Sequence, residues 1–138
     1  MKIQGRRMAG ACSLIVAVGL VASACTKQQG ASGDKSLTGV YTLESVNGNS
    51  VPATVTHQGV SVHVREGTFT INADGTCRSR TVFTPPSGSE VVREVNARYT
   101  RNGANLTMRW EGAGVTVGKI GDDVFTMDNE GMEFIYRK

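Results

Sequence analysis

The chain contains few of the residues from which enzyme active sites are built. It has only two histidines, His57 and His63, and it lacks the short motifs of a nucleophile elbow, a phosphate-binding loop, a zinc-binding helix and a dinucleotide-binding turn. His57 ends a short predicted strand and His63 lies on the solvent side of the next, so a catalytic triad is not expected. The sequence therefore predicts a protein that is not an enzyme and uses no cofactor.

Metal ligands are equally sparse. Copper favours thiolate and thioether donors, but no Cys-x-x-Cys or His-x-x-x-His pair occurs. Cys77 shares a predicted strand face with Phe83, so we expect a small buried hydrophobic residue rather than a reactive thiol. Asp122-Asp123 follows Gly121 in a hairpin, where acidic residues form turns. No metal site is expected, and three methionines fall at core positions instead: Met108, Met127 and Met132.

No apolar run is long enough to cross a bilayer as a helix. The uncharged segment from Met8 to Ala24 is shorter than the about 20 apolar residues that a span requires, and polar and glycine residues interrupt it. It follows a basic start with Lys2, Arg6 and Arg7, and it ends in the small residues Ala22-Ser23-Ala24. This is the layout of a secretory signal. We expect residues 1–24 to be a cleaved signal peptide.

Two cleavage sites fit the end of this signal. Ala22-Ser23-Ala24 alone suits ordinary signal peptidase and a freely secreted protein, whereas Ala22-Ser23-Ala24-Cys25 resembles the lipobox of bacterial lipoproteins. The second interpretation is preferred, because a polar linker follows Cys25 directly. It makes Cys25 the lipid-attachment residue and the membrane a partner through that lipid. Thr26 replaces the Asp that retains lipoproteins in the inner membrane, so the outer membrane, facing the periplasm, is expected in a Gram-negative host.

Loss of the signal changes the charge and the cysteine content of the mature chain. The full chain carries a formal net charge of +3, and removing Lys2, Arg6 and Arg7 makes it neutral. A nucleic-acid partner is therefore not expected. Cys12 is lost with the signal and Cys25 is acylated, which leaves Cys77 alone. No intrachain disulfide is then possible unless Cys25 escapes lipidation.

The mature chain divides into a linker and one small domain. Residues 25–36 contain no large apolar side chain and are expected to be a flexible tether. Residues 37–138 show short stretches rich in Val, Thr, Phe, Tyr and Ile between turn signals, which predicts an all-β domain. The predicted turns include Asn47-Gly48, Glu66-Gly67, Gly121-Asp122 and Glu130-Gly131. The predicted strands are Gly39–Ser45, Ala53–His57, Val60–Arg65, Thr68–Asn72, Thr76–Thr84, Val91–Thr100, Ala104–Trp110, Val115–Ile120, Asp123–Asp128 and Met132–Arg137.

Alternation along these strands predicts which side chains are buried, because successive side chains point to opposite faces of a sheet. Nearly every strand has a single apolar face, and one buried face per strand suits a closed antiparallel barrel of about eight to ten strands. The predicted core comprises Leu43, Val60, Val62, Val64, Phe69, Ile71, Phe83, Val95, Ala97, Tyr99, Leu106, Met108, Trp110, Phe125, Met127, Met132, Phe134 and Tyr136.

Five arginines are expected on the outside of this barrel. If their strands are neighbours, these arginines form a cationic stripe. The preferred alternative is a solvated surface on which Glu90, Glu94 and Glu111 balance their charge. The five are Arg78, Arg80, Arg93, Arg98 and Arg109.

Several segments resemble those of small bacterial lipocalin-like lipoproteins. Leu37–Leu43 is similar to their opening strand, and Gly67–Ile71 followed by Asp74-Gly75-Thr76 resembles a hairpin of that family. The resemblance covers nearly all of residues 37–138. The other matching segments, in the same order, are Val46-Asn47-Gly48, Val51-Pro52, Ala97–Thr100, Leu106–Met108, Gly121-Asp122, Phe125–Met127 and Phe134–Arg137.

This resemblance implies an up-and-down lipocalin-like barrel that binds a small apolar ligand. It also implies that the protein is located in the cell envelope. Lipocalin-like barrels are closed at the base by a Trp beneath an Arg of the last strand, and Tyr41 and Arg137 take these places here. Arg137 is expected to cover the Tyr41 ring and to bind backbone carbonyls. The aromatic residues expected to line a ligand cavity are Tyr41, Phe69, Tyr99, Trp110, Phe125 and Tyr136.

A second function remains open. The barrel core is filled in this alternative, and the protein is a structural or interaction module whose outer face or Thr84–Glu90 loop binds another envelope protein. The two functions differ in one observable property. The six aromatic side chains either surround a cavity or pack against one another.

Overall fold

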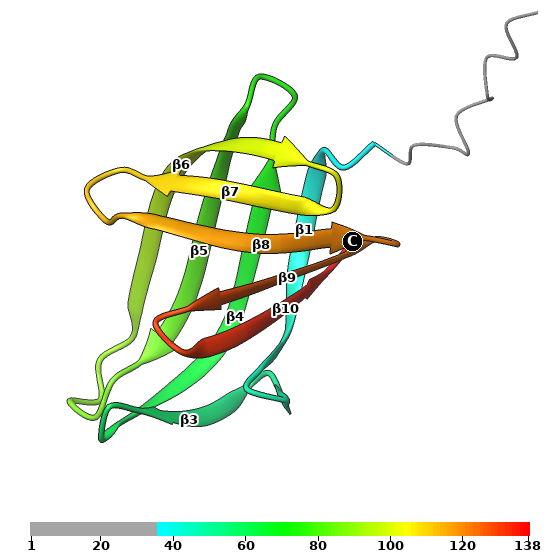
Figure 1. The fold of residues 1–138 in the computed structure, drawn as a ribbon. Coiled ribbons are helices and arrows are strands. Elements are labelled where there is room, and N and C mark those ends of the chain that lie inside the picture. Colours follow the sequence, from blue (N-terminus) through cyan, green and yellow to red (C-terminus); the bar gives the residue numbers. More distant parts are fainter. Residues whose placement is uncertain (1–35) are drawn as a thin grey trace, which may run out of the picture. The chain divides into compact units, whose positions relative to one another are not determined.

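The computed structural model describes residues 36–138. The expected signal peptide, Cys25 and most of the linker lie outside the described residues, and the expectations for them remain predictions. The described chain forms ten β-strands and no helix (Figure 1). The strands are β1 (Gly39–Val46), β2 (Asn49–Ser50), β3 (Ala53–His57), β4 (Val60–Ile71), β5 (Thr76–Thr84), β6 (Val91–Asn102), β7 (Asn105–Trp110), β8 (Val115–Gly121), β9 (Val124–Asn129) and β10 (Met132–Arg137).

Eight of these strands close into an antiparallel barrel with up-and-down topology. From β4 to β10 each strand pairs with the next in the chain, and β1 pairs with both β10 and β4. This double pairing of β1 closes the sheet (Figure 1). The strands β2 and β3 lie outside the ring, paired with β1 and β4 respectively. The predicted fold class, a small lipocalin-like β-barrel, is confirmed.

Strand β4 corrects the predicted boundaries. The sequence predicts two strands separated by a turn at Glu66-Gly67, but β4 runs without interruption through both. The pairing with β5 shifts between Val64 and Glu66, so Arg65 is an extra residue at a β-bulge. Gly67 points inward, where an added Cβ would lie 3.0 Å from the Leu43 Cδ2 atom. The glycine thus permits a close approach of β1 to β4 rather than a turn.

Four hairpins use two consecutive residues with positive φ. This geometry is typical of the type I′ turn, whose twist matches that of the strands it joins. Three of these turns are predicted from the sequence, whereas the β3–β4 turn is missed because Gln is an unusual residue at its first position. The four turns are Asn47-Gly48, Gln58-Gly59, Asp122-Asp123 and Glu130-Gly131.

One half of the barrel interior is packed solid, and we call it the packed half. Phe69 lies at its centre, with ring centroids 4.4 Å from Phe125, 5.7 Å from Tyr136 and 6.2 Å from Trp110. Phe69, Phe125 and Tyr136 are fully buried. Other buried side chains of the core are Tyr41, Leu43, Ile71, Cys77, Ala97, Leu106, Met108 and Ile120. The inward parity predicted from the sequence is confirmed for all predicted members of this set.

The barrel base is closed by a different cation from the one expected. The prediction that Arg137 covers Tyr41 is wrong, because Arg137 pairs with Thr42 and points outward, where it binds Glu44 at 3.2 Å. Lys138 takes its place, with Nζ 5.8 Å from the Tyr41 ring centroid. The Lys138 ammonium also donates hydrogen bonds to the carbonyls of Ser36 (2.8 Å) and Thr38 (2.6 Å).

We expect Lys138→Met to lower the free energy of unfolding by about 1–2 kcal/mol, because it removes the charge over the Tyr41 ring and two hydrogen bonds. Urea denaturation of the two proteins measures the difference. Arg137→Ala is the matched control, and it should change stability by less than about 1 kcal/mol because it breaks an exposed ion pair. A larger loss in the control than in Lys138→Met would contradict this account of barrel closure.

Candidate functional site

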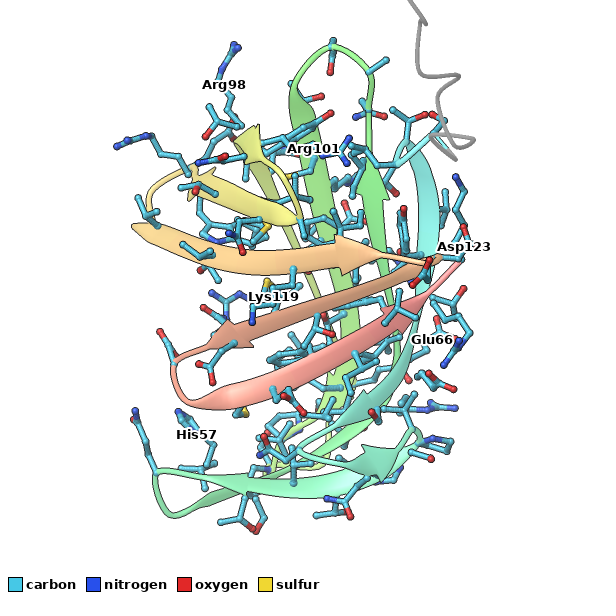
Figure 2. The ribbon with its side chains drawn as sticks, turned by 45° about the vertical axis from the view of Figure 1, so that its right-hand side comes forward. His57, Glu66, Arg98, Arg101, Lys119 and Asp123 are labelled. Atoms are coloured by element: carbon cyan, nitrogen blue, oxygen red, sulfur yellow. The ribbon has the colours of Figure 1, made fainter. Side chains whose placement is uncertain are left out.

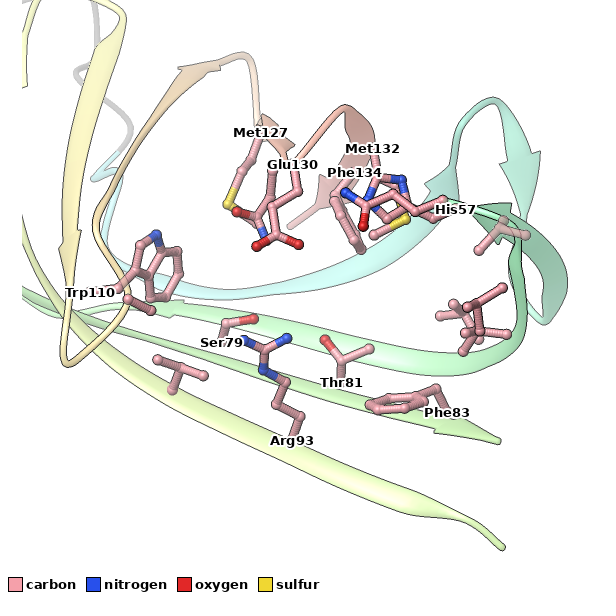
Figure 3. A pocket seen from close by; sticks show the side chains of 18 of the residues that line it. His57, Ser79, Thr81, Phe83, Arg93, Trp110, Met127, Glu130, Met132 and Phe134 are labelled. Carbon is pink, nitrogen blue, oxygen red and sulfur yellow. The ribbon is translucent and has the colours of Figure 1, made fainter. Parts of the chain in front are cut away.

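The other half of the barrel contains a cavity of about 390 Å³ (Figure 3). We call it the hollow half. Its wall between β6 and β7 is incomplete, because pairing of these strands starts at Ala97 and Trp110. In the described chain, the Val91–Val95 segment of β6 therefore pairs only with β5. The strand β3 extends the wall on the other side by pairing with the first residues of β4.

Most of the cavity wall is apolar. Val55 on β3 lies opposite Val62 on β4, so this hairpin presents a surface of valines to the cavity. Trp110 and Tyr136 belong to the aromatic core and also line the cavity, so they separate the two halves of the barrel. The remaining apolar lining residues are Val60, Val64, Phe83, Val95, Ala113, Met127, Met132 and Phe134.

Strands β5 and β6 add a polar group to this wall. Ser79 and Thr81 alternate on β5 with outward residues, and Arg93 is the direct partner of Thr81 across the β5–β6 pairing. The guanidinium of Arg93 extends into the cavity beside Ser79 (Figure 3). The expectation that Arg93 belongs to the exterior stripe is wrong. Its position has the same parity as Val95 and Ala97, so the pleat directs it inward.

Arg93 forms no ion pair with a carboxylate of the described chain, a property it shares with the exterior Arg98 and Arg109 but not with the arginines of β5. On β5, Arg78 binds Glu94, and Arg80 binds Glu66 at 3.2 Å. No ion pair of Arg93 exists among residues 36–138, although its side chain is exposed to the solvent that enters the cavity. The hollow half thus contains a cation that forms no ion pair within the described chain.

Two buried polar atoms at the cavity also have no hydrogen-bond partner within the described chain. They are the hydroxyl oxygen of Tyr136 and Nε2 of His57. Burial raises the pKa of Tyr136 to about 12, and the nearby Ser79 hydroxyl offsets part of that rise. A buried hydroxyl without a partner destabilises a fold by about 1–3 kcal/mol. An oxygen atom bound beside Ser79 would relieve this penalty.

A short polar chain fixes the indole of Trp110 at the cavity wall. Its Nε1–H donates a hydrogen bond of 2.9 Å to the Thr116 hydroxyl, which lies 3.5 Å from Oδ1 of Asn129. Trp110 is the only tryptophan of the chain. Its fluorescence is therefore a specific reporter of what occupies the cavity.

The six aromatic residues predicted to line a cavity fall into two groups. Trp110 and Tyr136 do line it. Tyr41, Phe69 and Phe125 belong to the packed half, and the Tyr99 hydroxyl donates a hydrogen bond of 2.7 Å to the carbonyl of Asn72. Ser79, Thr81 and Arg93 were missed as lining residues, although the alternation that identified Cys77, Phe83 and Val95 as inward points to all three.

The residues considered above as metal ligands lie in the core or in turns of the barrel. Cys77 is buried and free, and desolvation raises its thiol pKa to about 11, so it stays protonated at neutral pH. Met108 and Met127 are buried in the core, whereas Met132 is partly buried against it. Both Asp122 and Asp123 have positive φ and form the β8–β9 turn. No group of three metal-ligating side chains occurs within the described chain.

The described chain contains no helix of the length and apolarity that a membrane span requires. No family model, no curated protein and no solved structure matches this chain.

Proposed function

We propose that this protein is a non-catalytic lipoprotein of the cell envelope whose barrel binds a small, largely apolar molecule. The observation that carries the proposal is the cavity of about 390 Å³ in the hollow half. Binding sites for small molecules have volumes of about 300–1,000 Å³, with mostly apolar walls and a few polar groups. The valine surface of β3 and β4, together with Ser79, Thr81 and Arg93, has this composition.

The cavity volume limits the size of the ligand. A volume of about 390 Å³ equals that of about 13 water molecules in the liquid, at about 30 Å³ each. The part of the ligand inside the cavity therefore has about a dozen non-hydrogen atoms. This size fits a ten-carbon chain with one polar group.

The alternative function, a module with a filled core, has support only from the packed half. The aromatic cluster around Phe69 leaves no room for a ligand there. The hollow half differs, because the β6–β7 wall is incomplete and the side chains of Ser79 and Thr81 are small.

Attachment to the membrane through Cys25 is part of the proposal and is supported by the lipobox resemblance. It places the barrel at a lipid surface, where apolar ligands are concentrated. The mass of the mature N-terminus separates acylated Cys25 from a freely secreted chain.

We expect decanol to bind in the cavity and to shift the fluorescence of Trp110 in a saturable titration. The chain with Cys25→Ala avoids detergent, which would compete for the site. In that background, Val62→Phe should fill the cavity and weaken decanol binding at least about tenfold, a difference of about 1.4 kcal/mol. Val117→Phe makes the same change at an exposed position of β8 and should leave binding unchanged. Absence of a saturable fluorescence change would contradict the proposed function.

A further inference from the structure

The hollow half is polar on one wall and apolar on another. Arg93, Ser79 and Thr81 lie together on β5 and β6. The valines of β3 and β4 line the cavity on the far side of Phe83 from Ser79, because Phe83 pairs with Val64. A molecule that fills this space therefore meets Arg93 and two hydroxyls on one wall, and on the other mainly valines, with His57 and Gln58 at the end of their hairpin.

The polar end is suited to an anion. The guanidinium of Arg93 presents five N–H donors and has no acceptor. Ser79 and Thr81 add two hydroxyls that can donate, and the Tyr136 hydroxyl near Ser79 makes no hydrogen bond of standard geometry within the described chain. A carboxylate accepts several hydrogen bonds with its two oxygens and matches the planar fork of Arg93.

Glu130 is the opposing charge at this cavity. It lies in the β9–β10 turn with φ of 55° and extends toward the cavity from the side opposite Arg93 (Figure 3). No ion pair between the two is present. Both side chains are exposed, but Arg93 lies on a paired strand beside the hydroxyls of Ser79 and Thr81, whereas Glu130 lies in a turn. The donors gathered on β5 and β6 therefore favour an anion at this wall.

We propose that the ligand is an anionic amphiphile, a carboxylate on an unbranched chain of about ten carbons. The carboxylate binds Arg93 and the hydroxyls of Ser79 and Thr81, and the chain lies along the valines of β3 and β4. This inference rests on the proposed function. It adds the charge and the orientation of the ligand.

The test compares three probes that share a ten-carbon chain: decanoate, decanol and decyltrimethylammonium. Each is titrated into the Cys25→Ala chain at pH 8, where the carboxylate of decanoate is ionised. Trp110 fluorescence reports binding. Decanoate should bind at least about tenfold more tightly than decanol, and the cation should bind more weakly than both.

Substitutions assign this preference to Arg93. Arg93→Gln should remove the advantage of decanoate over decanol, and Arg93→Lys should retain part of it because the charge remains without the fork. Arg98→Gln is the matched control, since Arg98 lies on the same strand and points to solvent (Figure 2). It should leave all three affinities unchanged. Glu130→Gln should tighten decanoate binding or leave it unchanged.

The outcomes separate this inference from the proposed function. If no probe binds, both fail. If decanol and decanoate bind equally well, or if decyltrimethylammonium binds best, the cavity binds ligands but the inference is wrong. An unaltered preference for decanoate in a folded Arg93→Gln chain also overturns it. If Arg93→Gln does not fold, the comparison of probes on the parent chain and on Arg93→Lys decides.

Discussion

Phe69→Ala should lower the free energy of unfolding by about 3–5 kcal/mol. Phe69 is fully buried, and its ring contacts those of Phe125, Tyr136 and Trp110, so its removal leaves a void bounded by rigid aromatic groups. The strands that carry these rings are joined around the closed barrel and cannot collapse into the void. Urea denaturation followed by circular dichroism measures the loss.

Phe83→Ala is the matched control for Phe69→Ala. Phe83 is only partly buried and already borders the cavity of the hollow half. Its removal enlarges an existing space and forfeits fewer contacts, so the loss should be less than about 2 kcal/mol. A loss as large as that of Phe69→Ala would show that the hollow half is packed in solution, against the structure described above.

Gly118→Ala should lower the free energy of unfolding by about 1–3 kcal/mol, although alanine is usually harmless on a strand. Gly118 faces inward on β8, where an added Cβ would lie 2.5 Å and 2.8 Å from the Phe125 ring and 2.9 Å from the Thr126 carbonyl oxygen. Neither neighbour can move freely. The ring of Phe125 is held against Phe69 at 4.4 Å, and the carbonyl belongs to the backbone of β9.

Gly121→Ala tests whether this effect is steric. Gly121 is at the end of the same strand, and an added Cβ there meets no atom within 4 Å. The same chemical change should therefore alter stability by less than about 0.5 kcal/mol. Equal losses at positions 118 and 121 would attribute the effect to strand propensity and not to the contact with Phe125.

Most strands and buried side chains of the barrel could be predicted because the sequence patterns that indicate them are local. Alternation identified Leu106 and Met108 as inward neighbours on β7, and turn residues such as Glu130-Gly131 placed the strand ends. Both depend only on residues next to each other in the chain. The barrel follows from them, because strands with one apolar face must close or pair to bury it.

The errors occurred where pairing between distant strands decides the outcome. Glu66-Gly67 has the composition of a turn, and only the approach of β1 shows that the glycine serves packing against Leu43. The contact of Lys138 with Tyr41, Ser36 and Thr38 joins the two ends of the domain and forms only when β1 and β10 pair. The outward direction of Arg137 is a different case, because alternation with the inward Tyr136 already predicts it and only the family resemblance suggested otherwise.

The candidate site was only partly predictable for a related reason. Alternation shows that a side chain points inward, but not how far along the barrel axis it lies. Phe125 and Trp110 are both inward, yet one is enclosed in the packed half and the other lines the cavity. The position of a side chain along the barrel axis depends on the stagger of neighbouring strands and on where β7 ends. Both are properties of the assembled barrel and not of one strand.

The unpaired segment of β6 also bears on self-association of the protein. Between Val91 and Val95 its outer backbone groups have no strand partner in the described chain, and Val91 and Val92 are exposed. An apolar free edge of this kind promotes pairing between copies and aggregation, and charged residues oppose it. Arg93 and Glu94 interrupt the valines of this edge. An apolar residue in place of Arg93 would therefore cause self-association as well as altering the cavity, whereas glutamine keeps the edge polar.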